Sequence, residues 1–154
     1  MGASGAEQNL SEVMAAIEEL ISRHYFTYSR KFPEHQEFWD TIAAEEIEHA
    51  KWIRDLYAQS QEGKLSFNEK RFDKHSLLEF RSRLESMLRQ LEAKAQTHTD
   101  ALKSSVNLES MLLEKEFFTI FETDFPELKD VLKRLAVATQ NHRIKLDRAL
   151  KELP

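Results

Sequence analysis

The chain has 154 residues, with 27 acidic and 22 basic side chains, a net charge of −5 and no cysteine. This length is enough for one domain, 1–154, with a sizeable core. The acidic balance gives no reason to expect nucleic acid, and the lack of cysteine excludes disulfides, thiolate zinc sites and iron–sulfur clusters. No apolar run approaches the ~20 residues of a membrane span, and the first residues lack the pattern of a signal peptide. We therefore expect a cytoplasmic protein without a membrane partner.

Two helices are predicted in the first third of the chain. The first begins near Ser4 or Ser11 and ends before Pro33, because apolar side chains recur there at three- and four-residue spacing. The second begins near Pro33, a favourable first-turn residue, and ends near Gly63. The predicted buried faces carry Met14, Ile21, Tyr25, Phe32, Trp39, Ile42, Ile53 and Leu56.

A long crossover, about 63–97, is predicted next, with a helix of its own. Residues 63–75 show no clear period and are predicted to be a connector. Ser76 and Glu79 have the spacing of a capping box, which opens a helix. This third helix is amphipathic, so it could cover the bundle or pair with another subunit in a homodimer.

The last two helices are predicted at about 97–123 and 126–150, with a turn at Asp124 and Pro126 between them. A cluster of aromatic residues near this turn is predicted to be core: Phe117, Phe118, Phe121 and Phe125. Two helical hairpins joined by a long crossover make an antiparallel four-helix bundle. The predicted fold class is therefore all-α.

Polar side chains interrupt the predicted apolar faces of four helices. These residues are Glu18, Glu46, His49, Glu109, Glu116 and His142. A carboxylate on such a face is costly to bury unless it is paired or bound to metal. Together they predict a shared interior site; the alternatives are hydrogen-bonded pairs or surface carboxylates. The other histidines, His24, His35, His75 and His98, are expected to face solvent or to lie at helix ends.

The run EEIEHAK places Glu46 and His49 three residues apart on one helical face. Glu-x-x-His on two facing helices is how helical bundles build a carboxylate-bridged two-metal centre. The last helix carries the matching His142, but Thr139 stands where the second Glu is needed. The motif alone is weak evidence, because chance gives roughly one acid-x-x-His match in such a chain.

The first hairpin, IEELISRHYFTYSRKF followed by FWDTIAAEEIEHAKWI, resembles the rubrerythrin branch of the ferritin-like family. The family pattern is Glu, Tyr seven residues later, then Glu-x-x-His on the next helix; the matching residues are Glu18, Tyr25, Glu46 and His49. The family also places a Glu about thirty residues before its second Glu-x-x-His, which picks out Glu109 (139 − 109 = 30), with Glu114 as the alternative. The resemblance runs from about Glu7 to Leu150.

This resemblance implies a ferritin-like bundle with a non-haem di-iron centre. The implied metal ligands are Glu18, Glu46, His49, Glu109 and His142. Iron is the expected metal, with manganese or zinc as alternatives. Tyr25 is the candidate catalytic residue, and a core tyrosine is the alternative. The implied reaction is reduction of peroxide or oxygen, or oxidation of ferrous iron. Since the sequence has no Cys-x-x-Cys module, the electron donor is expected to be another protein.

Two departures from the family pattern open a second interpretation. Thr139 replaces the bridging Glu, and Glu116 stands where the family often has Tyr. Two divalent ions carry a charge of +4, and the three carboxylates Glu18, Glu46 and Glu109 balance only three of those charges. We therefore expect one ion bound tightly at Glu18, Glu46 and His49, and a second bound weakly at Glu109 and His142. The alternative is a degenerate one-metal or metal-free bundle with a structural or partner-binding role.

Overall fold

The computed structural model describes residues 5–61, 63, 66–67, 74–114 and 121–152, with side chains over 11–59, 63, 75–111 and 123–152. The elements in chain order are α1 (Gly5–Lys31), η1 (Pro33–His35), α2 (Gln36–Gln61), β1 (Ser66–Phe67), α3 (Lys74–Ala93), α4 (His98–Glu114), β2 (Phe121–Glu122) and α5 (Pro126–Lys151). The prediction of a helical chain is confirmed, and α3 begins two residues before the predicted Ser76.

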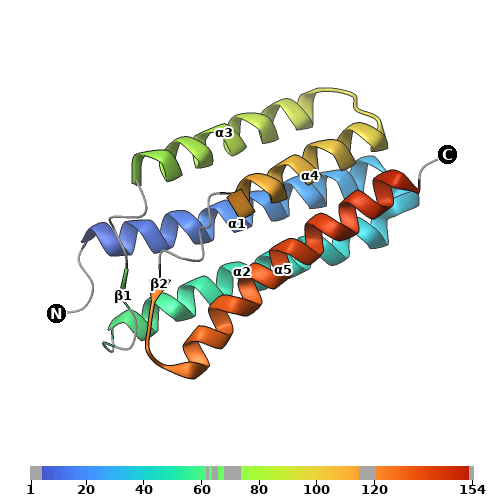
Figure 1. Ribbon diagram of the computed structural model, residues 1–154. Coiled ribbons are helices and arrows are strands. Elements are labelled where there is room, and N and C mark those ends of the chain that lie inside the picture. Colours follow the sequence, from blue (N-terminus) through green and yellow to red (C-terminus); the bar gives the residue numbers. More distant parts are fainter. Residues whose placement is uncertain (1–4, 62, 64–65, 68–73, 115–120, 153–154) are drawn as a thin grey trace.

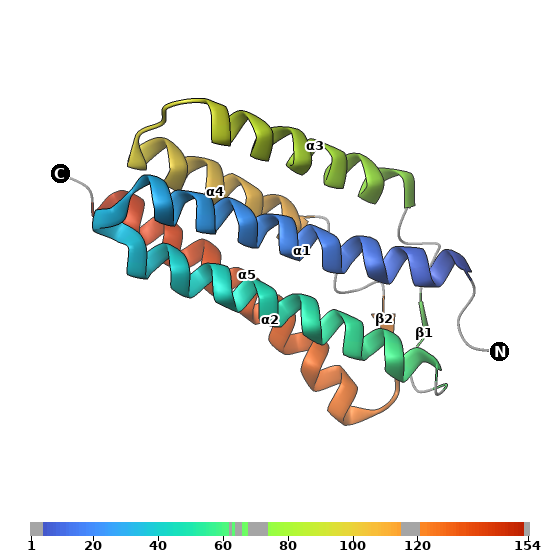
Figure 2. The same cartoon turned by 180° about the vertical axis from the view of Figure 1, so that it is seen from behind.

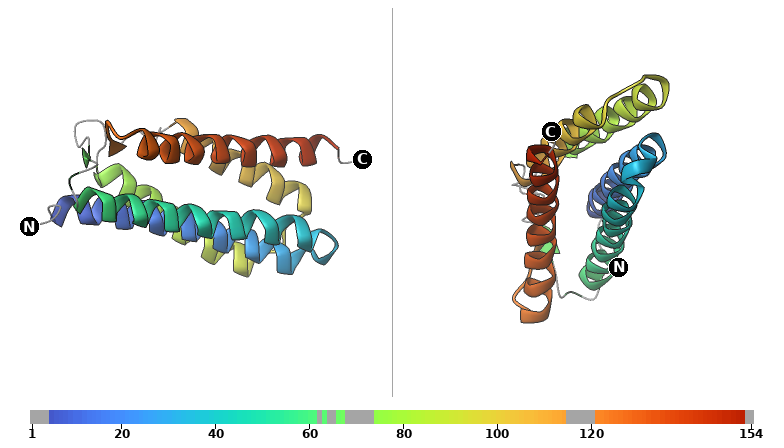
Figure 3. Two further views of the ribbon diagram at one scale, coloured as in Figure 1. Left: turned by 90° about the horizontal axis from the view of Figure 1, so that it is seen from below. Right: turned by 90° about the vertical axis from the view of Figure 1, so that its right-hand side faces the viewer.

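The helices form a bundle of two hairpins with α3 on the outside. α1 and α2 run antiparallel along one another, and so do α4 and α5 (Figure 1). The crossover returns along the length of the bundle as α3, which packs along α1 (Figure 2). Seen from below, α1, α2 and α5 run roughly along one direction, and α4 is inclined to α5 (Figure 3, left). This arrangement turns one face of each of α1, α2, α4 and α5 toward a common interior.

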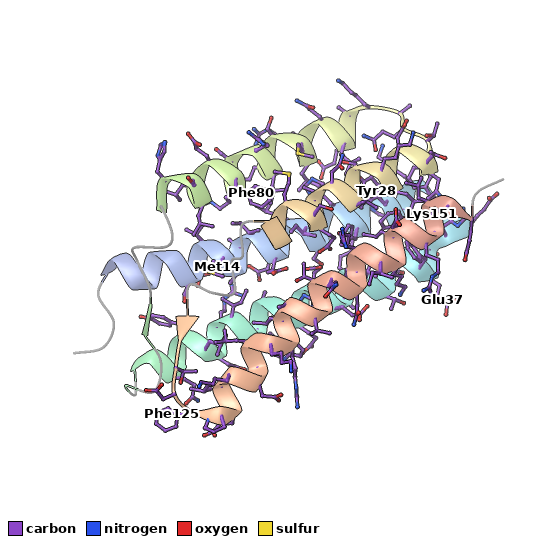
Figure 4. The ribbon with its side chains drawn as sticks, in the orientation of Figure 1. Met14, Tyr28, Glu37, Phe80, Phe125 and Lys151 are labelled. Atoms are coloured by element: carbon purple, nitrogen blue, oxygen red, sulfur yellow. The ribbon has the colours of Figure 1, made fainter. Side chains whose placement is uncertain are left out.

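The core follows the predicted apolar faces. Met14, Ile21, Trp39 and Ile42 are at most 2% exposed, which confirms the period-based prediction for α1 and α2. α3 contributes a stripe of its own: Leu77, Phe80, Leu84, Leu88 and Leu91 are buried. The side chains of Met14, Tyr28 and Phe80 can be followed in Figure 4. Because its apolar stripe is already buried, α3 covers the bundle in the single chain.

The fourth helix ends at Glu114, earlier than the predicted Thr123. Residues 121–122 instead pair antiparallel with 66–67 as two short strands, which the sequence analysis did not expect. Phe125 is 41% exposed, so its prediction as a core residue is wrong. It directly precedes Pro126, and a residue in that position is held in extended backbone at the helix start. Phe117, Phe118 and Glu116, and the side chain of Phe121, lie outside the described residues.

The start of α4 is set by a reciprocal cap. The Thr97 hydroxyl accepts a hydrogen bond from the Asp100 backbone N–H at 3.1 Å, and the Asp100 carboxylate accepts one from the Thr97 N–H at 3.4 Å. Such a box satisfies amide groups that the first turn leaves free. Among the described helices, none combines the length and apolarity that crossing a membrane requires.

Candidate metal centre

Four helices each bring polar side chains to the interior at the same level. α1 contributes Glu18, α2 contributes Glu46 and His49, α4 contributes Glu109 and α5 contributes His142. Each of these residues is at most 3% exposed. Charged groups buried this deeply require partners or a metal, since removing a charge from water costs several kcal/mol. The predicted site residues are therefore assembled in one buried cluster.

Both imidazoles converge on the Glu46 carboxylate. His142 Nδ1 lies 2.7 Å from Glu46 Oε1, and His49 Nδ1 lies 3.4 Å from Glu46 Oε2. One ligand atom each from Glu46, His49 and His142 can be chosen so that all three lie within 4.8 Å of one another, close enough to hold a single ion. The sequence predicts His142 as a ligand of a second ion, whereas the geometry groups it with His49.

Glu18 and Glu109 flank this group on opposite helices. His49 Nδ1 lies 4.0 Å from Glu18 Oε2, and His142 Nδ1 lies 3.6 Å from Glu109 Oε1. The side chain of Glu114, the alternative to Glu109, lies outside the described residues. Glu109 is fully buried and faces His142, so it meets the geometric requirement for the α4 ligand position.

One buried polar atom on each of the five residues has no hydrogen-bond partner within the described part of the chain. These atoms are Glu18 Oε2, Glu46 Oε2, His49 Nδ1, Glu109 Oε2 and His142 Nε2. Buried polar atoms in proteins are normally hydrogen-bonded, so unpaired atoms need an explanation. A bound cation provides one, because carboxylate oxygens and neutral imidazole nitrogens are metal ligands. The donor set thus suits a metal ion.

Without metal, protons must balance the buried negative charge. Burial, together with the Glu46 charge, raises the pKa of Glu109 to about 8. Burial and the neighbouring Glu46 likewise raise the pKa of Glu18 well above its ordinary value. Burial by itself would lower the pKa of His142, but its hydrogen bonds to Glu109 and Glu46 raise that pKa to about 10.

Glu46 is the carboxylate that stays ionised in this cluster. Burial opposes its charge, but the neighbouring Glu18, His142 and His49 side chains hold the pKa of Glu46 below its ordinary value. A protonated His142 beside an ionised Glu46 makes a neutral pair. Protons on Glu18 and Glu109 then occupy the positions where a cation would supply charge.

Tyr25 donates a short hydrogen bond to the α4 carboxylate. The distance from its hydroxyl oxygen to Glu109 Oε1 is 2.6 Å, and the ring is fully buried. Burial, with the nearby Glu109 charge, raises the pKa of Tyr25 well above its ordinary value, so the phenol keeps its proton. Tyr25 therefore both lies in the core and contacts a candidate ligand.

Thr139 supplies no carboxylate to the cluster. It is 1% exposed and lies one turn before His142 on α5. Its hydroxyl donates to the Leu135 carbonyl of its own helix at 3.0 Å, which is a common way for a threonine to satisfy itself within a helix. The position predicted to lack a carboxylate is therefore buried beside the cluster, with a neutral hydroxyl already in use.

Two neighbours of the cluster were missed in the sequence. Glu45 Oε1 lies 3.5 Å from His142 Nε2. The Glu45 side chain is half exposed, so it lies between the cluster and solvent. The Trp52 ring lies 5.5 Å from the His49 ring between centroids. The only signal in the sequence was position: Glu45 adjoins Glu46, and Trp52 follows His49 by one helical step of three residues.

The remaining histidines divide into three cases. His75 is exposed, and His35 and His98 lie at helix ends, as predicted. The prediction for His24 is wrong, since it is 1% exposed. Its Nδ1 lies 2.8 Å from the Leu20 carbonyl, and burial lowers the pKa of His24, which favours a neutral core imidazole.

Comparison with protein-family models, with curated proteins and with solved structures found no match. Function therefore has to be argued from the geometry of the cluster and from the residues that form it.

Proposed function

We propose that this chain is a rubrerythrin-like metal protein with a ferritin-like bundle, and that it binds iron and reduces peroxide or oxygen. The observation that carries the proposal is the buried cluster: five ligand-type residues from four helices, each with an unpaired polar atom in the described structure. Packing alone gives no reason to bury them at one level. The crossover topology with two antiparallel hairpins supports the ferritin-like part.

The donor set favours iron or manganese over softer metals. Three carboxylates and two imidazoles offer oxygen and nitrogen ligands, and the sequence has no cysteine. The first ion would be held by Glu46, His49 and His142, whose ligand atoms lie within 4.8 Å of one another. Glu18 and Glu109 would complete that ion or hold part of a second. Thr139 makes a complete second site unfavourable.

Ferrous iron at this position would supply one-electron reducing chemistry toward a small oxidant. The protein's own residues would exclude bulk water, since every candidate ligand is buried. Tyr25, which donates to Glu109 Oε1 at 2.6 Å, would keep a hydroxyl proton beside the unpaired Glu109 oxygen. An external donor would then restore the reduced state.

A second candidate is a metal-free structural bundle. It is favoured by two short contacts, His142 to Glu46 at 2.7 Å and Tyr25 to Glu109 at 2.6 Å, which satisfy part of the cluster without any ion. In that case the buried network would help to specify helix pairing rather than to bind a ligand. Both candidates predict a folded helical protein, so metal binding separates them.

The test is anaerobic titration with ferrous iron, followed by elemental analysis of the desalted protein and by peroxide consumption. We expect at least one ion per chain, and loss of tight binding in Glu46→Gln. His75→Gln is the matched control, because His75 is exposed and far from the cluster in the chain. If the parent protein retains no metal under these conditions, the structural role replaces the redox role.

A further inference from the structure

Buried aromatic side chains lead from the candidate metal centre to one end of the bundle. Tyr25, bonded to Glu109, lies 5.7 Å from Trp39 between ring centroids. Both rings are 0% exposed. The Trp39 indole N–H donates to His98 Nε2 at 3.1 Å. The path thus crosses from α1 to α2 and then to α4 by direct contacts.

The path ends at two stacked imidazoles near the surface. The His98 and His35 rings lie 3.7 Å apart between centroids, with 1° between their planes. Both residues are only partly buried. His35 belongs to η1 and His98 is the first residue of α4, so the pair lies where the turn between α1 and α2 meets the start of α4. A reductant in solution can approach this pair, whereas it cannot reach Trp39.

Each oxidisable ring on the path already donates a hydrogen bond to a proton acceptor. Losing an electron makes a phenol or an indole strongly acidic, so a base that takes the proton favours the oxidation. Tyr25 donates a hydrogen bond to Glu109 at 2.6 Å. His98 is that base for Trp39, because its Nε2 lone pair already accepts the indole N–H while the ring proton of His98 sits on Nδ1.

We propose that Trp39, acting through Tyr25, supplies one electron to the buried centre during peroxide reduction, and that His98 takes the indole proton. The inference rests on the proposed reduction of peroxide. Converting one H₂O₂ to two waters consumes two electrons and two protons. With Thr139 in place of a further carboxylate, one tightly held ferrous ion accounts for one electron and Trp39 for the other.

Each proton and electron in this reaction has a named source and destination. The two protons that form water come from solvent, and the Trp39 N–H proton moves to His98 Nε2. The neutral indole radical is later restored by a one-electron reductant at the surface, of the ascorbate or small-thiol class, while His98 returns its proton. Tyr25 passes the electron and ends unchanged, with its hydrogen bond to Glu109 kept.

The chain has 2 tryptophans, so one other tryptophan could serve as the electron donor in place of Trp39. Trp52 lies 5.5 Å from the ring of His49, a candidate ligand, and is partly buried. Distance to the centre alone would favour Trp52. The hydrogen-bonded base at its indole N–H favours Trp39.

The experiment is freeze-quench electron paramagnetic resonance after anaerobic ferrous loading and one equivalent of peroxide. Protein made with ring-deuterated tryptophan, and separately with ring-deuterated tyrosine, identifies the radical by residue type without any mutation. We expect a tryptophan radical in the parent and in Trp52→Phe, where Trp39 is the sole tryptophan, and its loss in Trp39→Phe. His98→Phe keeps a ring beside His35 but removes the acceptor, so radical yield should be at least about tenfold lower with iron binding unchanged.

The outcomes separate the relay from the function on which it rests. If iron binds and peroxide is consumed but the radical is absent, lies on tyrosine only or disappears in Trp52→Phe, the relay is wrong and the proposed function stands. An unchanged yield in His98→Phe overturns the role of His98. Failure to bind iron or to consume peroxide overturns both proposals.

Discussion

Glu46 and His142 are 96 residues apart in the chain, yet Glu46 Oε1 and His142 Nδ1 lie 2.7 Å apart in the interior of the bundle. This contact joins α2 of the first hairpin to α5 of the second. It also brings both histidines of the site to one carboxylate, because His49 Nδ1 lies 3.4 Å from the other Glu46 oxygen. Glu46 is therefore the residue around which the candidate centre is organised.

Replacing His142 by Gln should weaken ferrous binding by at least about tenfold, since even outer-shell changes at metal sites cost 10–100-fold. Gln keeps a polar side chain of similar length but offers no imidazole nitrogen. Anaerobic isothermal titration measures the change, with His75→Gln as the control on an exposed helix position. Equal affinity in the parent and in His142→Gln would remove His142 from the ligand set.

Replacing Thr139 by Glu should raise iron occupancy from about one toward two per chain and increase peroxide-dependent iron oxidation. The physical reason is charge: two divalent ions need a fourth carboxylate, and Thr139 is buried beside the cluster. Thr139→Gln is the matched control, because it adds the same bulk without charge and should leave occupancy unchanged. If the parent already binds two irons tightly and Thr139→Glu changes nothing, the charge argument is wrong.

The metal-free protein should lose stability as pH rises from about 5 to about 10. Glu109 has its pKa raised from 4.5 to about 8, and His142 from 6.5 to about 10. In both cases the folded state holds its proton more tightly than the unfolded chain. Their contribution is therefore complete below the ordinary pKa and lost as pH passes through the raised one.

Urea unfolding of chelator-treated protein across this pH range measures the effect. Glu109→Gln removes the Glu109 titration while keeping an oxygen that can accept from Tyr25, so its stability should fall less between about pH 5 and 8. A parent protein whose free energy of unfolding increases over the same range would contradict the assignment of these protons.

Metal binding should release protons. Glu109 and His142, with pKa values raised to about 8 and about 10, hold protons near neutral pH, and a bound cation would displace them. Titration with ferrous iron in buffers of different ionisation enthalpy should therefore show about two protons released per first ion at pH 7. Apparent affinity should rise as pH increases from about 6 to 8. Binding that is independent of both buffer and pH would show that Glu109 and His142 have already lost these protons.

The helical faces could be predicted from the sequence because burial follows a 3.6-residue period. That period placed Glu18, Glu46 and His49 on the inward faces of α1 and α2, where the structure also places them. The same period placed Glu109 and His142 on the inward faces of α4 and α5. These features are local, since each depends only on the geometry of one helix.

Tertiary structure decided how those faces meet. The periodicity of α5 cannot reveal its axial shift against α2, and that shift sets His142 beside Glu46 and half-exposed Glu45. His24 on α1 is likewise buried, and the cover that α3 supplies by packing along α1 cannot be read from the α1 sequence. The pairing of 66–67 with 121–122 joins two segments far apart in the chain. Sequence determined which side chains turn inward; the stagger and contact of whole helices determined which of them touch.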